Sequence, residues 1–460
     1  MLKAAFTGLA LALLAACTVG PRHVVPEVPL PSAFDQSTTE ATQQSVVPKV
    51  WSGFGSAELD ALIVRALEAN TTIAQAAARL AETRALSGLA IYSWFPTITV
   101  EADQNKSQFS GQDPFSTPGN FETWRAGFDA TWEIDLFGGL RNEQRSIDRR
   151  AQADAAALAD ARLSIIAETA QAWFALVGAR ERLALQRRQL AILEENVAIM
   201  QARVDAGSSN ALDLQRAITQ ARSLAALVPD SEAEVVRQEQ RLAVLTAWTV
   251  GELRAHLSER ATIPELPVLV ATGTPEEWMK RRPDIREAER LLAAATSDVG
   301  DEIADYFPKL NLVGEFGWTS DRREALGESE TERWFYGPSL TWSFLDFGRV
   351  RQYVKAAEAR RDGAIAQYQE TILRALEETE NALAGFRAAN QSEDELRAAA
   401  AAATEAARLS KMRYDVGAAD YLTLLDAERT MLDLEDRHVQ AESRRATALA
   451  ALYKALAGDL

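Results

Sequence analysis

The sequence predicts a mainly α-helical, internally duplicated chain that also carries strands of a membrane β-barrel. Three observations predict this fold: motifs that recur 210 residues apart, two long proline-free segments, and short segments in which apolar and polar side chains alternate. The long segments, 139–206 and 349–416, are rich in Ala, Leu, Glu, Gln and Arg, which favour helix. At 1.5 Å per residue each helix would be roughly 100 Å long, which exceeds the width of a globular domain.

The composition excludes several classes of protein. The 460 residues include 49 basic and 66 acidic side chains, and the formal charge of −17 argues against nucleic-acid binding, which needs a basic surface. One cysteine excludes a disulfide framework and a cysteine-rich zinc site. The three histidines are scattered along the chain, and no nucleophile–histidine–carboxylate cluster is recognisable. We therefore expect no catalytic residues, no metal and no cofactor apart from a covalent lipid.

Residues 1–16 have the features of a signal peptide. Lys3 precedes an apolar run that ends at Leu14 and is shorter than the roughly 20 apolar residues of a membrane-spanning helix. The stretch Leu14-Ala-Ala-Cys17 resembles the bacterial lipobox, which implies that Cys17 is acylated and becomes the new N-terminus. The alternative is an ordinary cleavage site beside a coincidental cysteine. Because Thr18 and not aspartate follows, the resemblance implies the outer membrane, and residues 17–56 would be a lipidated N-terminal tether.

Two structural repeats follow the tether. Trp132 corresponds to Trp342, and the same offset of 210 relates Phe137-Gly138 to Phe347-Gly348. Further matches are Arg203-Val-Asp-Ala-Gly207 with Arg413-Tyr-Asp-Val-Gly417 and, at an offset of 212, Trp94-Phe-Pro96 with Tyr306-Phe-Pro308. We therefore expect a first repeat at 57–270 and a second at 271–460.

Each repeat is predicted to contain a helix, a strand, a loop, a second strand, a very long helix and a returning helix. The expected segments of the first repeat are 57–92, 97–104, 123–135, 139–206 and 210–248. Those of the second repeat are 276–305, 309–318, 335–345, 349–416 and 420–457. Barrel strands thus fall within about 97–135 and 309–345, and tunnel helices within about 139–248 and 349–457. Pro229 predicts a kink in the first returning helix, and the polar segments 105–122 and 319–334 are expected to be extracellular loops.

The strands alternate in a way that fits a water-filled barrel in lipid. Trp124, Phe128 and Trp132 share one face of their strand, whereas Asp129 and Glu133 lie on the other. A soluble, half-buried sheet would alternate in the same way, and the outer-membrane signal favours the barrel. Four strands cannot close a barrel, because bacterial barrels begin at about eight strands. Three copies of the chain would supply twelve.

Glycines mark the ends of the long helices and the corners before them. Gly207 and Gly417 are expected to cap the C-termini of the long helices. At the two corners between strand and long helix, Leu136-Phe-Gly138 corresponds to Asp346-Phe-Gly348, where the glycine permits the turn and a nearby aspartate can cap the helix.

Aspartates follow the capping glycines on the returning helices. In a trimer Asp213, Asp420 and Asp426 would each form a ring of like charges, which is unfavourable without compensating cations or donors. The alternative is that Asp420 is an N-cap and that the other two lie on a solvated face.

The combined motifs resemble those of the TolC-like outer-membrane factor family, in its lipoprotein NodT/OprM-type efflux branch. The resemblance covers nearly the whole mature chain, and its motifs are Cys17–Pro21, Arg281–Arg290, Tyr306–Leu310, Tyr421–Arg429 and Leu452–Leu456. It implies a homotrimer with a twelve-stranded barrel and a twelve-helix coiled-coil periplasmic tunnel. It also implies two partners, a periplasmic adaptor and an inner-membrane efflux transporter.

The resemblance also implies roles for individual residues. Leu422 and Asp426 match positions that narrow the closed tunnel, and Asp420 and Asp213 lie nearby in sequence or in the equivalent turn. The segments Arg203–Gly207 and Arg413–Gly417 are similar to the tip motifs that contact adaptor hairpins, although simple helix termination would explain them too.

The function expected from these observations is passive conduction from an inner-membrane pump to the exterior in a tripartite RND-type efflux system. The alternatives are an outer-membrane component of a type I secretion or metal or solvent export system, and a non-transporting coiled-coil scaffold. We expect a lipid-anchored protein of the Gram-negative outer membrane that extends into the periplasm. Acidic side chains on the inward face suggest a preference for cations: Glu101, Asp103, Asp129 and Glu133.

Overall fold

A computed structural model of the chain describes residues 18–36, 54–110, 112, 119–258, 261–267 and 270–456. Cys17 and most of the second half of the expected tether lie outside the described residues. The chain divides into two compact units: Met1–Glu27, Ala78–Ala155 and Glu287–Glu370 form unit 1, and Val28–Ala77, Ala156–Arg286 and Thr371–Leu460 form unit 2. None of the described helices is both long enough and apolar enough to cross a membrane.

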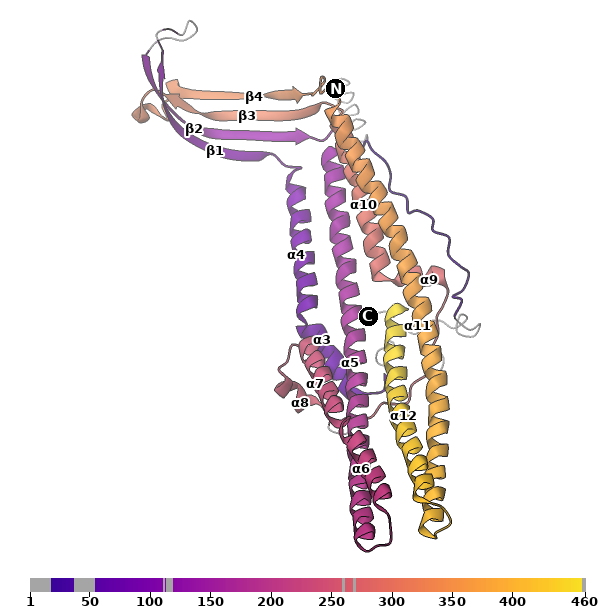
Figure 1. Cartoon of the computed structure of the whole chain (residues 1–460). Coiled ribbons are helices and arrows are strands. Elements are labelled where there is room, and N and C mark those ends of the chain that lie inside the picture. Colours follow the sequence, from indigo (N-terminus) through magenta and orange to yellow (C-terminus); the bar gives the residue numbers. More distant parts are fainter. Residues whose placement is uncertain are drawn as a thin grey trace. The chain divides into compact units, whose positions relative to one another are not determined.

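Unit 1 contains one four-stranded antiparallel sheet. Its strands are β1 (Thr97–Phe109), β2 (Gly119–Ile134), β3 (Lys309–Ser320) and β4 (Glu332–Thr341), in the order β1-β2-β3-β4 (Figure 1). β1 and β2 come from the first repeat, and β3 and β4 from the second. The junction between β2 and β3 therefore joins the two repeats side by side.

The strands are longer at one end than the sequence predicted. The expected loop 105–122 is wrong over most of its length, because β1 and β2 stay paired as far as Phe109 opposite Gly119. An ion pair of 3.2 Å between Lys106 Nζ and Glu122 Oε2 joins the two strands there. The polar residues at this end therefore belong to the paired strands and not to a loop.

In the second repeat, the expected loop 319–334 is shorter than predicted and contains two 3₁₀ turns. These turns are η2 (Arg323–Ala325) and η3 (Ser329–Thr331). β4 then ends at Thr341, four residues before its predicted end at 345.

The two long helices are confirmed. They are α5 (Gly139–Asp205) and α11 (Arg349–Asp415), each of 67 residues and each ending one residue before its predicted end. Both helices contribute their first part to unit 1 and the remainder to unit 2. The equal lengths follow from the duplication.

The segment 57–92 is two helices and not one. α3 (Ala57–Ala69) and α4 (Thr71–Tyr92) are separated by Asn70. The buried Asn70 side chain donates to the Leu245 carbonyl over 2.9 Å and accepts from the Thr72 backbone N–H over 2.8 Å. These bonds hold Asn70 in an extended conformation and explain the break.

Proline accounts for the other breaks. The segment 210–248 forms α6 (Ala211–Ala225) and α7 (Val228–Thr246), which confirms the kink predicted at Pro229. The segment 276–305 forms α9 (Pro275–Arg281) and α10 (Pro283–Ala304), and the prediction of one helix there is wrong. Arg282 is extended, with ψ of 124°, because a residue before proline is disfavoured in the helical region. A short helix that was not predicted, α8 (Val250–His256), follows α7.

Unit 2 is packed around buried residues near the end of α12 (Tyr421–Ala455). Trp278 is fully buried, and its indole N–H donates to the Ala455 carbonyl over 3.0 Å. Arg282 donates to the same carbonyl over 2.9 Å. Phe34, from the N-terminal segment, packs edge-on against Trp278 at 5.6 Å between ring centroids. Part of the predicted N-terminal tether is therefore packed against unit 2 at Phe34.

Candidate functional site

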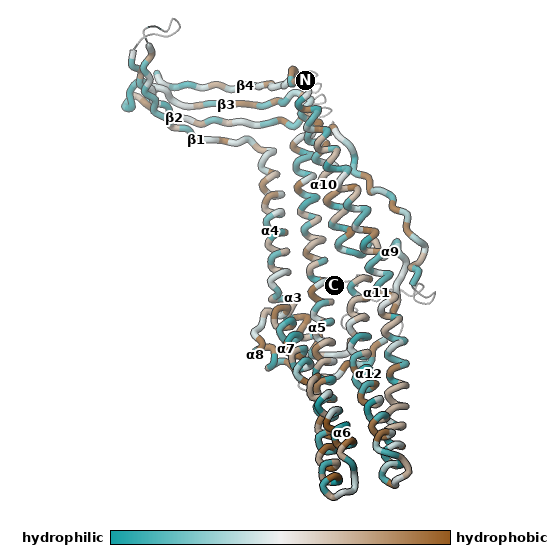
Figure 2. Tube along the Cα trace, viewed as in Figure 1, coloured by the Kyte–Doolittle hydropathy of each residue, from teal (hydrophilic) through white to brown (hydrophobic). Residues whose placement is uncertain are grey.

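One face of the sheet carries a band of apolar side chains that crosses all four strands. Across the strands, Val100 lies opposite Phe128, Phe128 opposite Phe316, and Phe316 opposite Trp334. These side chains are 41% to 74% exposed. Hydrophobic and hydrophilic residues are interspersed along the strands (Figure 2). Most of the apolar side chains lie on this face, although Val313 and Phe335 lie on the other. Soluble proteins rarely expose an apolar patch of this extent, and a lipid environment would cover it.

The opposite face carries polar and charged side chains. Asp103 lies opposite Arg125, and Asp129 opposite Glu315, which forms an ion pair with Arg333. A sheet with one apolar and one charged face fits a barrel wall between lipid and water.

The sheet is not closed. Within the described part of the chain, β1 pairs only with β2 and β4 only with β3. Each therefore keeps one edge of unpaired backbone groups, and each such group would cost several kcal/mol in lipid. The sheet needs further strands before it can lie in a membrane.

Aspartates fix both corners at which a strand leads into a long helix. Asp135 accepts hydrogen bonds from the backbone N–H of Gly138 (2.7 Å) and of Arg141 (3.1 Å). Asp346 accepts from Gly348 (2.9 Å) and Val350 (2.7 Å), and the bond from Val350 lowers the pKa of the Asp346 carboxyl. The predicted capping role of a nearby aspartate is confirmed at both corners.

The duplication is also visible in side-chain hydrogen bonds. The indole N–H of Trp132 donates to the Trp94 carbonyl over 2.9 Å, and that of Trp342 donates to the Tyr306 carbonyl over 3.0 Å. These four residues are the pairs matched in the sequence. The two repeats therefore share local geometry as well as motifs.

The tips of the two helical hairpins lie in unit 2 and have the same cap. Gly207 and Gly417 have φ of +69° and +73°, and both accommodate this conformation because they lack a Cβ. Ser208 N–H donates to the Arg203 carbonyl over 2.8 Å, and Ala418 N–H donates to the Arg413 carbonyl over 2.7 Å. These bonds close a Schellman motif at each tip, so all four predicted adaptor residues also terminate the long helices.

The structure links the two tips through a contact that sequence reasoning missed. Arg203 Nη1 donates to the Tyr414 hydroxyl over 2.8 Å, and the guanidinium lies 5.5 Å from the centroid of the Tyr414 ring. Tyr421 packs against Tyr414 at 5.8 Å, and burial raises the pKa of Tyr421 to about 12. A signal was present: Tyr414 stands where the first repeat has Val204, so the two tip motifs differ at this position.

The predicted constriction residues differ in their surroundings. Asp420 is the N-cap of α12 and accepts from the Thr423 backbone N–H over 2.9 Å, and its bonds with Thr423 lower its pKa. Asp213 lies in the first turn of α6, 3.3 Å from Arg216. Leu422 and Asp426 are exposed on α12. The N-cap alternative for Asp420 is therefore observed, and the rings that three copies would form stay a prediction.

A hollow of about 690 Å³ lies above these tips between α5, α6 and α12. Leu212, Leu224, Leu425 and Leu432 supply its apolar lining. Gln186 also lines it, is 1% exposed, and donates to Asp436 Oδ1 over 3.2 Å.

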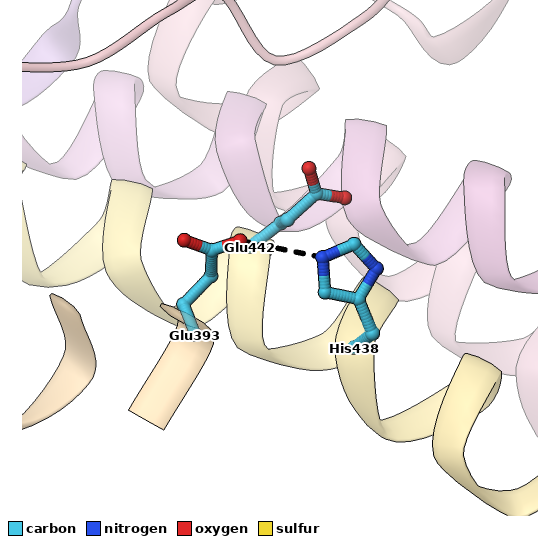
Figure 3. Close-up of side chains that lie close together, drawn as sticks. All are labelled: Glu393, His438 and Glu442. Atoms are coloured by element: carbon cyan, nitrogen blue, oxygen red, sulfur yellow. Dashed lines mark hydrogen bonds and ion pairs between the residues drawn. The ribbon is translucent and has the colours of Figure 1, made fainter. Parts of the chain in front are cut away.

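Figure 3 shows a cluster of Glu393, His438 and Glu442 between α11 and α12 whose oxygen and nitrogen atoms lie within 4.8 Å of one another. The Glu393 side chain is fully buried and accepts from Arg397 Nη2 over 2.6 Å. Arg445 Nη1 lies 3.4 Å and His438 Nε2 3.3 Å from the same carboxylate. Because two guanidinium groups already neutralise Glu393, the cluster fits an ion-pair network better than a cation site.

Comparison with known proteins identifies the family. The profile named "Outer membrane efflux protein" matches residues 62–247 and again 274–458. The chain belongs to this family of outer membrane efflux proteins. The two matches fall within the two repeats predicted from the sequence, which supports the duplication independently.

Relatives and solved structures agree with this assignment. Outer membrane protein OprJ of Pseudomonas aeruginosa is 31% identical, with 100% of this chain and 97% of OprJ covered. Nodulation protein T of Rhizobium leguminosarum bv. trifolii is 26% identical over 91% of this chain and 89% of its own length. The structure of the outer-membrane channel OprN has a TM-score of 0.89 and 34% identity, covering 96% of this chain and 99% of that chain.

These findings confirm the predicted family, fold class and outer-membrane location. The chain is an outer-membrane efflux channel protein, as the sequence predicted. The family consists of channels and not of enzymes. The roles of Cys17, of the constriction residues and of the adaptor-contact residues stay predictions.

Proposed function

We propose that three copies of the chain close a twelve-stranded barrel and together form the passive outer-membrane duct of a tripartite RND-type efflux system. The observation that carries the proposal is the open sheet, which has an apolar exposed face, a charged opposite face and two unpaired edges. Three sheets of four strands give twelve, which exceeds the minimum of about eight strands in bacterial barrels. Such a barrel is wide enough to hold water.

The helical tips are proposed to gate the duct. Leu422, Asp426, Asp420 and Asp213 would narrow the closed tunnel, and the contact between Arg203 and Tyr414 would hold the two tips of each chain together. Binding of a periplasmic adaptor at Arg203, Gly207, Arg413 and Gly417 would separate the tips. The driving energy would come from the inner-membrane transporter, since the duct is passive.

A lipid on Cys17 would anchor the protein beside the barrel. In unit 1 the Val19 N–H donates to the Phe137 carbonyl over 3.0 Å, and Gly138 is so close to Thr18 that an added Cβ would lie 2.6 Å from Thr18 Cγ2. Thr18 therefore lies at the end of the sheet, and acyl chains on the residue before it would enter the adjacent leaflet. Several acyl chains anchor stably, at about 0.8 kcal/mol per buried CH₂.

Two alternatives lead to different measurements. Relatives include a solvent efflux pump outer membrane protein, SrpC, and a pyoverdine export outer membrane protein, OpmQ. These different names support the proposal that the inner-membrane partner selects the cargo. A type I secretion, metal or solvent export role would appear as a different pattern of sensitivity when the gene is deleted. A non-transporting scaffold would have no bore.

Single-channel recording in planar bilayers tests the proposed duct. We expect ion current through the assembled protein and a larger current after Asp426→Ala, because alanine is smaller than aspartate and widens the constriction in all three chains. An assembled protein that carries no current, even with the tip substituted, would contradict the duct and favour the scaffold.

A further inference from the structure

The two repeats build their strand pairs in the same register. In the first repeat the β1–β2 ladder ends at Thr97 opposite Thr131, and in the second the β3–β4 ladder ends at Lys309 opposite Thr341. The offsets between these residues, 212 and 210, are those found in the sequence. Strand β3 is thus equivalent to β1, and β4 to β2, residue by residue.

The junction between β2 and β3 has no counterpart within the described chain. Trp132, Glu133 and Ile134 extend β2 beyond its last pair with β1 and pair only with β3. The equivalent residues after β4 are Trp342, Ser343 and Phe344, and they are not in a strand. These three residues alternate between apolar and polar, as in a strand. We infer that they would extend β4 if another strand paired with its outer edge.

The corner after β2 has a partner that the equivalent corner after β4 lacks within the described chain. Phe137 stacks on Phe307, which precedes β3, with centroids 4.5 Å apart and planes 16° from parallel. The equivalent Phe347 is 91% exposed and has φ of +53°, a conformation that is unfavourable for a bulky residue. The equivalent of Phe307 is Phe95, which precedes β1 and is 59% exposed. Both members of a second stacked pair are therefore present, at opposite edges of the sheet.

We propose that β4 of one chain pairs with β1 of the next in the register of β2 with β3, and that Phe347 stacks on Phe95 of the partner subunit. Applying the two offsets places Thr341 opposite Glu101 of the partner subunit and Trp342 opposite the partner's Val100. Phe344 then lies opposite Ile98 of the partner subunit, which extends β4 to the end that its sequence predicts. The inference rests on the proposed trimer and specifies how its chains join.

The side-chain pattern agrees with this register. Leu340, Trp342 and Phe344 would meet Ala102, Val100 and Ile98 of the partner subunit on the apolar face, and Thr341 would meet Glu101 of the partner subunit on the polar face. A slip by one residue would place polar side chains of one strand beside apolar ones of the other along the whole junction. Leu340 and Val100 are 64% and 74% exposed in the single chain, so both edges have apolar surface available for pairing.

Engineered disulfides test the register. A chain carrying Thr341→Cys and Glu101→Cys is oxidised in outer membranes and analysed by non-reducing electrophoresis. We expect covalent dimers and trimers, because opposed strand residues bring Cβ atoms close enough for a disulfide, whereas diagonal neighbours lie about 7–8 Å apart. The register-shifted combinations Thr341→Cys with Asp103→Cys, and Thr341→Cys with Thr99→Cys, should cross-link much less.

The chain supplies its own calibration. Thr131 lies opposite Val313 at the β2–β3 junction, so Thr131→Cys with Val313→Cys is the equivalent pair within one chain and should give an intrachain disulfide only. The single variants Thr341→Cys and Glu101→Cys are controls for disulfides that either engineered cysteine forms with Cys17. Stronger cross-linking of a shifted pair than of the aligned pair, or an intrachain disulfide between positions 341 and 101, would overturn the register.

A thermodynamic cycle tests the stacking. Phe347→Ala and Phe95→Ala should each lower the temperature at which the trimer dissociates, and the double variant should lose little more than either single one. Strictly additive losses, or no loss in the single variants, would contradict the stacked pair. Native mass spectrometry of each variant separates this question from the proposed function. A conducting trimer with a different register refutes only the junction, whereas a chain that stays monomeric refutes the duct itself.

Discussion

At the scale of single residues, the duplication made some contacts predictable and left others hidden. The helix-capping aspartates could be predicted because Asp346 adjoins a Phe-Gly corner that occurs twice, and Asp135 and Asp346 both cap the helix that follows. The contact between Arg203 and Tyr414 could not be predicted, because it joins two helices whose relative rotation no sequence motif specifies. The break at Asn70 was hidden for a related reason, since its carbonyl partner lies 175 residues away.

The tip contact leads to a prediction about gating. Tyr414→Phe removes the acceptor of the Arg203 hydrogen bond but keeps the aromatic ring beneath the guanidinium. The lost bond is worth about 1 kcal/mol, so the tips should separate more often and the mean current through the resting channel should rise several-fold. Tyr353→Phe, on the unit 1 part of α11, is the matched control and should leave the current unchanged. Equal currents from the wild type and Tyr414→Phe would contradict a gating role.

A half-buried carboxyl on α10 gives the protein a pH-dependent stability. Burial, together with the nearby charges of Glu143 and Asp305, raises the pKa of Asp301 from 3.8 to about 6. Because the folded pKa lies above the ordinary value, the folded state binds the proton more tightly, and stability falls as the pH rises through this range. Asp301→Asn should therefore stabilise the protein at pH 7.5 by about 1 kcal/mol after allowance for solvent screening, and much less near pH 4.

Thermal denaturation of Asp301→Asn in detergent at the two pH values measures this effect. Asp321→Asn, at an exposed position beyond β3, is the matched control and should behave as wild type at both. If Asp301→Asn is less stable than the wild type at pH 7.5, the ionised Asp301 carboxylate stabilises the folded state, which contradicts the prediction.

At the scale of elements, continuous features were predictable and interruptions were less so. The long helices α5 and α11 were predicted to within one residue, because their composition is uniform and each is followed by a glycine. The break before Pro283 was missed because the periodic apolar pattern continues through it, although the residue before a proline disfavours helix. The early end of β4 has a different cause, since its last residues lack a neighbouring strand within the described chain.

Glycine-to-alanine changes should lower the stability at the helix caps and raise it inside a long helix. Gly207→Ala and Gly417→Ala should each destabilise the protein by about 1 kcal/mol, because alanine disfavours a positive φ. No atom lies within 4 Å of a Cβ added at either position, so the loss would be conformational and not steric. Gly385→Ala, inside α11 and equally free of neighbours, should stabilise by about 0.5–1 kcal/mol. Melting temperatures that fall for all three variants would contradict the assignment of the caps.

At the scale of the whole molecule, the sheet has the two faces of a barrel wall, and its polar face should set ion selectivity. Asp129 and Glu133 lie on that face of β2. Neutralising both with Asp129→Asn and Glu133→Gln should shift the reversal potential in a salt gradient toward that of chloride, because the pore loses negative charge from each of three chains. Glu330→Gln, outside the strands in η3, is the matched control. An unchanged reversal potential would show that the polar face does not line the conducting path.

Most of the architecture could be predicted because the chain contains two repeats that form the same structural unit. Each repeat tests the interpretation of the other, as Trp132 and Trp342 show with equivalent hydrogen bonds. What the single chain cannot contain is the junction between chains, and its traces are the exposed Phe347 and the unpaired edges of β1 and β4.

Native mass spectrometry of the purified protein in detergent tests the need for neighbouring chains most directly. The account predicts a complex of three chains, each contributing four strands to one barrel. A stable, detergent-solubilised single chain, or a complex with another number of copies, would contradict it.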